Sequence, residues 1–518
     1  MAFVLNNSTF LKGVIILLYL FSGLSGYSQS KGKKSKRRVE IISANSLEVD
    51  PKKGKGAKRL IGNVVFKQDN VYMYCDSAYF FTKTNTLDAY NNVRIKQGDS
   101  LNLYGDTLHY NGNSKFAKMR GNVTLDNNQI ILNCDQLDYD MKNKFAYYVG
   151  GGTIYNKEEK STLVSDQGYY YPDTEYFFFK DNIHLKHPDY DIKADTMKFH
   201  SKSEITYFLG PTYIVVDSNF IYCERGKFNP QKKISYFVKN ASITSKEQII
   251  KGDSIFYDQG NKIGELFENV SIIDTLENIT INGDYSKYNE VDSTSIITGN
   301  VLLMQTFDTD TFFLHADTLY SYYDSTRTNQ MIAAYHHVKF YKSDMQGKCD
   351  SLFFSDADST IKMFINPIMW SDANQMTADF IEIKQYDGEI KNFYLNKNAF
   401  IISEEDTSKY NQIKGKDMIG SFKKNELNRI NVFNNGQTIY YAKNDDHITY
   451  IGVNKAVCND MIILLDSNQI KTITFLTQPT ATLFPLSKVN TAELILDGFK
   501  WYGNIRPKRK EDVFEWKE

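Results

Sequence analysis

LNLYGDTLHYNGNSKFAKMRGNVTL, residues 101–125, reads as two β-strands joined by a short polar turn. In the first strand Leu103 has one side-chain parity, whereas Leu108 and Tyr110 have the other. Strand side chains alternate with a period of two, so this slip turns the apolar face over unless the strand bends. Gly105-Asp106 lies at the slip. Gly tolerates unusual backbone angles and Asp can bond nearby N–H groups, so we expect a bend there.

The second strand of this stretch has Gly121-Asn122 at its middle, with Met119 and Val123 in apolar phase around it. The turn between the strands falls at Asn111–Ser114. The stretch therefore predicts a hairpin of two strands, each bent halfway along its length.

The same pattern recurs along most of the chain, with a period of about 30 residues, which marks a repeat architecture. A small residue followed by an acid or amide is found at Ala44-Asn45, Cys75-Asp76, Gly105-Asp106, Cys134-Asp135, Ser165-Asp166, Ala194-Asp195, Cys223-Glu224, Gly252-Asp253, Gly283-Asp284, Ala316-Asp317, Cys349-Asp350 and Ala378-Asp379. A second bend position alternates with it, at Asn63-Val64, Asn92-Val93, Asn122-Val123, Asn182-Ile183, Asn269-Val270 and Asn300-Val301, with Gly152, Pro211, His337 and Asn366-Pro367 as irregular members.

Each repeat has two short polar turns, and short turns cannot make parallel crossovers, so neighbouring strands should be antiparallel. Aromatic residues form 14% of the chain, which suits strands. We expect an all-β fold: an elongated open β-jelly-roll of bent antiparallel strands, in which each strand folds over at its bend. Two apolar half-sheets would then face one another along a trough. A repeat chain of this kind is one long, quasi-one-dimensional domain.

The first 28 residues resemble a secretory signal. Their apolar run, Gly13–Leu24, fits the usual ~7–15 residues and is short of the ~20 needed to span a bilayer. An uncleaved inner-membrane anchor is the alternative. A basic leader follows at residues 29–38; it is a solvated tail or a contact with anionic lipid headgroups.

The expected organisation continues with β-jelly-roll repeats over residues 39–411, divergent C-terminal repeats or a cap over 412–505, and a charged tail over 506–518. End repeats are often atypical. Within the divergent part, Ala492–Trp501 reads as a last strand.

The cysteines in the small-residue position are predicted to be free, buried thiols. Cys75, Cys134, Cys223 and Cys349 all occupy that position, and no two adjacent repeats both have one. At ~4.8 Å per strand, successive cysteines would lie on the order of 19 Å apart. A disulfide needs Cα atoms within ~7 Å.

The column of acids at the bends is the most visible polar feature. It could be read as paired carboxylates for glycoside chemistry or as a Ca²⁺ ladder. It is too uniform for one active site and always accompanies the bend, so capping of the bend is favoured. The His residues lack metal-ligand spacing, nucleotide and nucleophile motifs are absent from the sequence, and the net charge of −1 gives no case for nucleic acid. We therefore expect no enzyme activity, cofactor or metal.

The trough is the remaining candidate site, as a long groove for acyl chains. The alternative is an ordinary dry core filled by its own side chains. The predicted lining is Met73, Phe80, Leu103, Leu108, Tyr110, Leu132, Leu137, Tyr139, Met197, Phe199, Phe228, Ile255, Tyr257, Leu352 and Phe354.

The bent strands resemble the A-D-x-L-x-Y-D element of the OstA-like family, the lipopolysaccharide-transport bridge proteins of double-membraned bacteria. Gly105-Asp106-Thr107-Leu108-His109-Tyr110 and Cys134-Asp135-Gln136-Leu137-Asp138-Tyr139-Asp140 have this element. Gly62-Asn63-Val64, Gly121-Asn122-Val123 and Gly299-Asn300-Val301 are similar to its G-N-V element. The resemblance covers roughly Val39–Phe400.

This resemblance implies a periplasmic carrier that shields lipopolysaccharide acyl chains between inner- and outer-membrane machinery. It also implies contacts with other lipopolysaccharide-transport proteins through exposed edge strands. The chain is several times longer than a minimal bridge, so whether it must oligomerise stays open. Two other classes are kept: a structural or adhesive repeat protein of the cell envelope with a self-filled core, and a polysaccharide-active β-solenoid, for which no clustered cleft is found.

Overall fold

The computed structural model describes residues 38–54, 56–98, 101–126, 129–171, 174–216, 218–308, 310–386, 389–423, 426–444, 449–466, 469–489 and 494–516. The expected signal segment at residues 1–28, and the basic leader up to residue 37, lie outside the described residues. Among the helices of the described part, none has the length and apolar character needed to cross a membrane.

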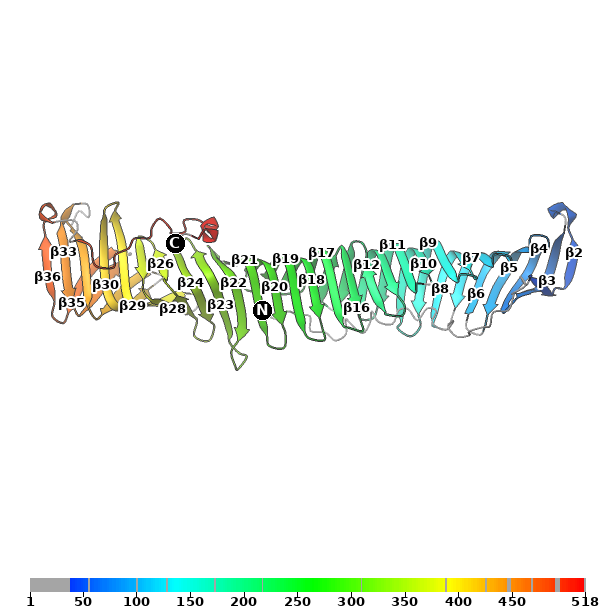
Figure 1. The fold of residues 1–518 in the computed structure, drawn as a ribbon, viewed down its shortest axis with the longest axis horizontal. Helices are drawn as coiled ribbons and strands as arrows, with labels where there is room; N and C mark the ends of the chain where they lie inside the picture. Colours follow the sequence, from blue (N-terminus) through cyan, green and yellow to red (C-terminus); the bar gives the residue numbers. More distant parts are fainter. Residues whose placement is uncertain are drawn as a thin grey trace. The chain divides into compact units, whose positions relative to one another are not determined.

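The chain divides into two compact units. Of the described residues, the N-terminal unit comprises residues 38–246 and 251–264, and the C-terminal unit comprises residues 247–250 and 265–516. Figure 1 shows bent strands following one another in chain order within each unit.

The strands of the N-terminal unit are β1 (Glu40–Ser43), β2 (Ser46–Val49), β3 (Ala57–Gln68), β4 (Val71–Phe81), β5 (Thr86–Gln97), β6 (Leu101–Asn111), β7 (Phe116–Asp126), β8 (Ile130–Asp140), β9 (Phe145–Asn156), β10 (Ser161–Tyr171), β11 (Tyr176–His187), β12 (Tyr190–His200), β13 (Ile205–Phe208), β14 (Thr212–Val216), β15 (Asn219–Cys223), β16 (Arg225–Asn229) and β17 (Ile234–Thr244). A 3₁₀ turn, η2 (Pro51–Lys53), links β2 to β3, and β18 (Gln248–Asp258) follows β17.

The strands of the C-terminal unit are β19 (Ile263–Asp274), β20 (Ile279–Asn289), β21 (Thr294–Thr306), β22 (Thr311–Tyr323), β23 (Gln330–Tyr341), β24 (Met345–Ser355), β25 (Thr360–Phe364), β26 (Ile368–Ser371), β27 (Asn374–Thr377), β28 (Phe380–Tyr386), β29 (Glu389–Asp406), β30 (Lys409–Lys423), β31 (Glu426–Phe433), β32 (Gly436–Lys443), β33 (Tyr450–Cys458), β34 (Asp460–Asp466), β35 (Gln469–Leu476) and β36 (Thr480–Phe484). Two 3₁₀ turns follow, η3 (Leu486–Lys488) and η5 (Lys510–Phe514).

Neighbouring strands pair antiparallel, and the register shifts at the bend. Ile61 pairs with Ser77 while Val64 pairs with Cys75, so two residues of β3 oppose one residue of β4. This is the geometry of a β-bulge, which bends a strand and re-aims its side chains. The extra residue lies in β3 at the second bend position, opposite the acidic bend of β4 where the parity slips. The predicted all-β jelly-roll of bent antiparallel strands is confirmed as the fold class.

The backbone at the second bend position explains its composition. Two consecutive residues there have positive φ, a left-handed conformation that Gly and Asn adopt most easily. These pairs are Gly62-Asn63, Asn91-Asn92, Gly121-Asn122, Gly150-Gly151, Asp181-Asn182, Lys239-Asn240, Glu268-Asn269, Gly299-Asn300, His336-His337, Ile365-Asn366, Lys397-Asn398, Asn434-Asn435 and Thr477-Gln478. Two irregular positions of the prediction differ from this pattern. Near Gly152 the left-handed pair is Gly150-Gly151, which precedes Gly152. Pro211 lies between β13 and β14 in a bend whose φ values are not positive.

The acids of the first bend position accept hydrogen bonds from the second. The Asn122 Nδ2 atom donates to the Asp106 Oδ2 atom over 2.7 Å. The same contact recurs from Asn92 to Asp76, Asn182 to Asp166, Asn240 to Glu224, Asn300 to Asp284 and Asn398 to Asp379. The acidic column thus caps the bends, as its regularity predicts.

The bend splits each strand into two arms. We call half-sheet A the arms that precede the acidic bend, such as Leu101–Tyr104, together with the arms that pair with them. Half-sheet B comprises the arms that follow the acidic bend, such as Thr107–Asn111, and the arms that pair with those. Burial alternates within each arm and changes parity at the bend: Leu101 and Leu103 are buried before it, and Leu108 and Tyr110 after it. The apolar face is therefore kept on the inside of both arms.

The chain end differs from the prediction. Residues 494–501, within the expected last strand Ala492–Trp501, form no strand, and residues 490–493 lie outside the described residues. Instead, residues 494–516 run back over the C-terminal unit as an extended segment, drawn in orange to red in Figure 1. We call this segment the strap.

Candidate functional site

The predicted trough lining lies on the inner faces of the two half-sheets. Fourteen of its fifteen members are buried, and Phe354 is half-buried. Leu103 and Leu132 come from half-sheet A, and Leu108 and Leu137 come from half-sheet B. The structure therefore brings these residues into the apolar layer between the arms; whether lipid occupies that layer stays a prediction.

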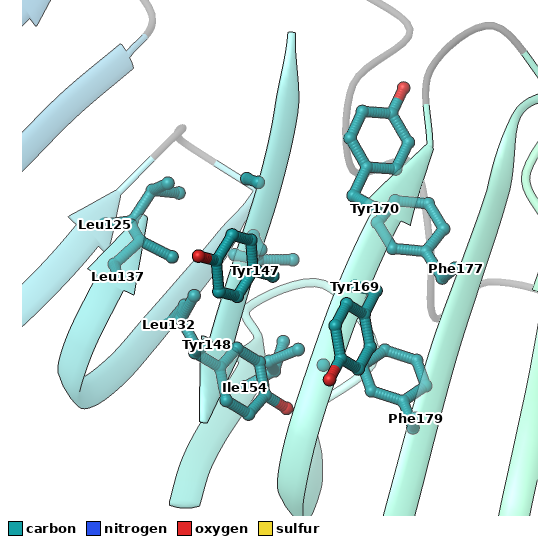
Figure 2. Close-up of a pocket in the computed structure, with 13 residues that line it drawn as sticks. Leu125, Leu132, Leu137, Tyr147, Tyr148, Ile154, Tyr169, Tyr170, Phe177 and Phe179 are labelled. Carbon is teal, nitrogen blue, oxygen red and sulfur yellow. The ribbon is translucent and has the colours of Figure 1, made fainter. Parts of the chain in front are cut away.

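Around Leu137 and Tyr148 in the N-terminal unit, side chains leave little free space in this layer. A cavity of about 50 Å³ remains beside Leu137 and Tyr148, about the space of one or two water molecules. Figure 2 shows leucines of β7 and β8 and aromatic rings of β9, β10 and β11 around it.

Buried hydroxyl groups hold the two half-sheets of the N-terminal unit together. The Tyr110 hydroxyl, in half-sheet B, donates to the Gln68 Oε1 atom of half-sheet A over 2.6 Å. The hydroxyls of Tyr148 and Ser165 lie 2.6 Å apart. Burial raises the pKa of Tyr110 and of Tyr148, so both phenols stay neutral at physiological pH. These bonds satisfy polar groups that would otherwise destabilise an apolar layer.

The C-terminal unit contains a much larger space between its half-sheets, with a cavity of about 610 Å³. Ile401 and Ile413 of half-sheet A face Ile430, Leu465 and Ile470 of half-sheet B across it. Its volume is in the range of ligand pockets, ~300–1,000 Å³. None of the fifteen predicted lining residues borders this cavity, and polar side chains such as Asn374 and Ser403 share its lining with the aliphatic ones.

The rim of this cavity is polar and carries an ion pair. The Lys443 Nζ atom lies 2.6 Å from the Glu405 Oε2 atom, and the Asn411 Nδ2 atom donates to Glu405 Oε1 over 2.6 Å. The hydrogen bond to Glu405 raises the pKa of Lys443. Asp372 and Glu404 complete the rim. An apolar floor with charged groups at its edge suits an amphipathic ligand whose head stays at the surface.

The other polar candidates are explained by the fold. The five cysteines are free; Cys134 is half-buried and the rest are buried. Burial raises the pKa of the Cys75 thiol to about 12, which leaves it protonated and unreactive at neutral pH. His336 and His337 do not alternate in a strand; they form a left-handed bend pair and contact Asp350 and Asp317. Within the described residues, no group of three or more His, Cys, Asp or Glu side chains is placed to hold a metal ion.

Sequence reasoning missed the residues of the large cavity, because they follow residue 400, where the repeat becomes irregular. One signal was available. The spacing loosens at Ser403–Tyr410 (SEEDTSKY), and this segment includes three residues of the cavity lining, Ser403, Glu404 and Glu405. A break in the period marks the place where the two half-sheets separate.

Comparisons with known proteins agree with the motifs. Residues 36–195 match the OstA-like protein family, and residues 280–389 match the family of LptA and LptD N-terminal lipopolysaccharide-transport proteins. Among solved structures, the crystal structure of LptH from Pseudomonas aeruginosa, described as the LptA homologous periplasmic component of the conserved lipopolysaccharide transport device, is 12% identical. That match covers 21% of this chain and 84% of LptH, with a TM-score of 0.20. Among curated proteins there is no match.

Proposed function

Because this chain belongs to the OstA-like family of lipopolysaccharide-transport proteins, we propose that it is a non-enzymatic carrier that shields lipopolysaccharide acyl chains between its two half-sheets. The observation that carries the proposal is the cavity of about 610 Å³ in the C-terminal unit, whose lining combines aliphatic side chains with polar and charged ones. Acyl chains would lie against Ile413 and Leu465, and the polar head would stay beside Glu405 and Lys443.

Elementary energetics supports a binding site of this kind. Removing acyl chains from water gives ~0.8 kcal/mol per CH₂ group, so a lipid with several chains gains enough to bind without any specific polar contact. The two arms of each strand are covalently joined only at the bend. The half-sheets can therefore separate at the edge opposite the bends, where the turns lie, without any change of strand pairing within either half-sheet. Repeats of similar lining would allow the lipid to move between equivalent positions.

The proposed setting is the periplasm, where the chain would pass lipid toward the outer membrane. Its partners there would be other lipopolysaccharide-transport proteins, joined through edge strands. In the N-terminal unit, the edge strands β1 and β2 expose Ile42, Leu47 and Val49, which strand addition would cover.

A second function is favoured by a different observation. Around Leu137 and Tyr148 the layer between the half-sheets leaves a cavity of only about 50 Å³, as expected of a structural or adhesive envelope protein with a self-filled core. In that case the trough residues serve stability alone. The two functions differ in whether the inner face ever contacts lipid.

Photocrosslinking in cells separates the two functions, using neighbouring positions on opposite faces. Leu465 lines the cavity and is 6% exposed, whereas Leu464 points outward and is 40% exposed. Leu108 and His109 form the same kind of pair in the N-terminal unit. Capture of lipopolysaccharide from Leu465 and Leu108 supports the carrier. Capture from Leu464 and His109 alone rejects it.

A further inference from the structure

We infer that the strap keeps the C-terminal cavity open, by packing on the outer face of the same strands whose inner face lines that cavity. The inference rests on the proposed function, because it concerns the proposed lipid site. It assigns positioning roles to Gln375 and Gln412, two buried side chains that hold the strap.

The two glutamines clamp the strap backbone in the same way. The Gln412 Nε2 atom donates to the Leu494 carbonyl over 2.8 Å, and the Leu496 N–H donates to Gln412 Oε1 over 2.9 Å. Gln375 repeats this pattern with the Lys500 carbonyl and the Tyr502 N–H, each over 2.7 Å. Gln375 is 1% exposed and Gln412 is 2% exposed, so loss of either clamp leaves buried backbone groups unpaired.

The strap continues beyond the clamps toward β22 and β23. The Arg506 Nε atom donates to Gln346 Oε1 over 2.7 Å, and the Lys339 ammonium donates to the Glu515 carbonyl. The Phe514 ring packs on His315, with ring centroids 4.8 Å apart. Each contact uses a residue on the outer face of half-sheet A, so the strap follows that face from β32 back to β22.

Apolar packing accompanies these hydrogen bonds. Leu494 and Leu496 join Phe400, Ile402 and Ile439 in one buried cluster. Trp370 and Ile368 pack with Ile505 farther along the strap.

Cavity and strap lie on opposite faces of two strands, β29 and β30. In β29, Ile401 lines the cavity, while Phe400 and Ile402 on either side pack against the strap. In β30, Ile413 lines the cavity and Gln412 clamps the strap. β29 is therefore apolar on both faces, as strands covered on both sides are, whereas β30 meets the strap through the polar side chains of Gln412 and Lys414.

The physical reason for this arrangement is the cost of empty space. A half-sheet that faces a cavity loses packing contacts on its inner face, and that cost rises with cavity volume. The strap restores burial on the outer face, so the strands remain ordered without collapsing onto half-sheet B. The layer around Leu137 and Tyr148 in the N-terminal unit shows the opposite condition, because the cavity there is only about 50 Å³.

The test uses the full chain with both clamps removed, Gln375→Leu together with Gln412→Leu. Leucine is close in size but cannot bond the strap backbone. Gln385→Leu, on β28 in half-sheet B, is the matched control. Trypsin cleavage at the exposed Lys500 reports strap release.

A long-chain fatty acid with a photoreactive group is the probe for the cavity. Mass spectrometry of labelled peptides gives the yield of labelling at the cavity and at the N-terminal unit.

We expect the double variant to release the strap and to lose labelling of the Leu465 peptide at least several-fold, while its labelling near Leu108 is unchanged. The control variant should keep both the protected strap and the labelling of the Leu465 peptide. The inference is overturned if the strap stays protected from trypsin, or if it is released and cavity labelling is unchanged or rises. Absence of labelling at both places in the unaltered chain instead overturns the proposed function.

Discussion

The bend at Gly121 offers a quantitative test of how the sequence builds the fold. Gly121 has a φ of 74°, and a Cβ atom added there would lie 2.5 Å from the Asp106 Oδ2 atom. Gly121→Val therefore combines left-handed strain of ~1–2 kcal/mol with crowding of ~1–3 kcal/mol. We expect a loss of about 2–5 kcal/mol in local stability. The turn glycine Gly98 is the control, because its φ is 62° and a Cβ atom there would meet nothing within 4 Å.

Native-state hydrogen exchange is the appropriate assay, because repeat proteins open locally and a single melting curve averages over many repeats. Gly121→Val should lower the protection of amides in β6, β7 and β8 at least about tenfold, since every ~1.4 kcal/mol is a factor of ten. Gly98→Val should lose only the strain component. Equal effects of the two variants, or unchanged protection in Gly121→Val, would refute the reasoning that the bend needs a left-handed residue beside a capping acid.

Three further predictions follow from buried groups. Burial raises the pKa of the Cys134 thiol from 9.0 to about 11, so the folded chain holds this proton more tightly than the unfolded chain. The free energy of unfolding in urea titrations should therefore keep the full contribution of this thiol below pH 9 and lose it between pH 9 and about 11. Alkylation of Cys134 at pH 8 should be slow until denaturant is added. Burial lowers the pKa of His315, which packs against Phe514 and lies near Asp317, His337 and Lys339. Its contribution to stability is therefore complete above its ordinary pKa of 6.5 and is lost as the pH falls below that value. Hydrogen exchange of residues 510–516 should rise in acid in the unaltered chain and should not rise in His315→Gln. Leu137→Ala in the packed N-terminal unit should cost ~2–5 kcal/mol locally, measured by hydrogen exchange of β8, whereas the same change at the exposed Leu464 should cost little.

The bends were predictable because their determinants are local. The parity slip from Leu103 to Leu108 requires a change of face, and Gly or Asn at the opposite bend matches the left-handed backbone found there. The lining residues follow from the same alternation, so the sequence pattern alone places them on the inner faces. Where the bend uses other residues the prediction was less accurate: the left-handed pair is Gly150-Gly151, and the prediction named Gly152.

The strap and the large cavity were not predictable in this way, because they depend on contacts between segments far apart in the sequence. Gln412 and Leu496 are 84 residues apart. Alternation indicates which face of Ala492–Trp501 is apolar, but it does not say that the segment covers a sheet rather than extends it. A usable signal was the run Ala399-Phe400-Ile401-Ile402, which is apolar without alternation and so predicts a strand covered on both faces.

The central claim, that the space between the half-sheets holds lipid acyl chains, is tested most directly by native mass spectrometry of the full chain purified from its own envelope. The account predicts a population heavier than the polypeptide by the mass of lipopolysaccharide, which dissociates as lipid on collisional activation. Detection of the bare polypeptide alone, in preparations where a control lipid carrier keeps its ligand, would contradict it.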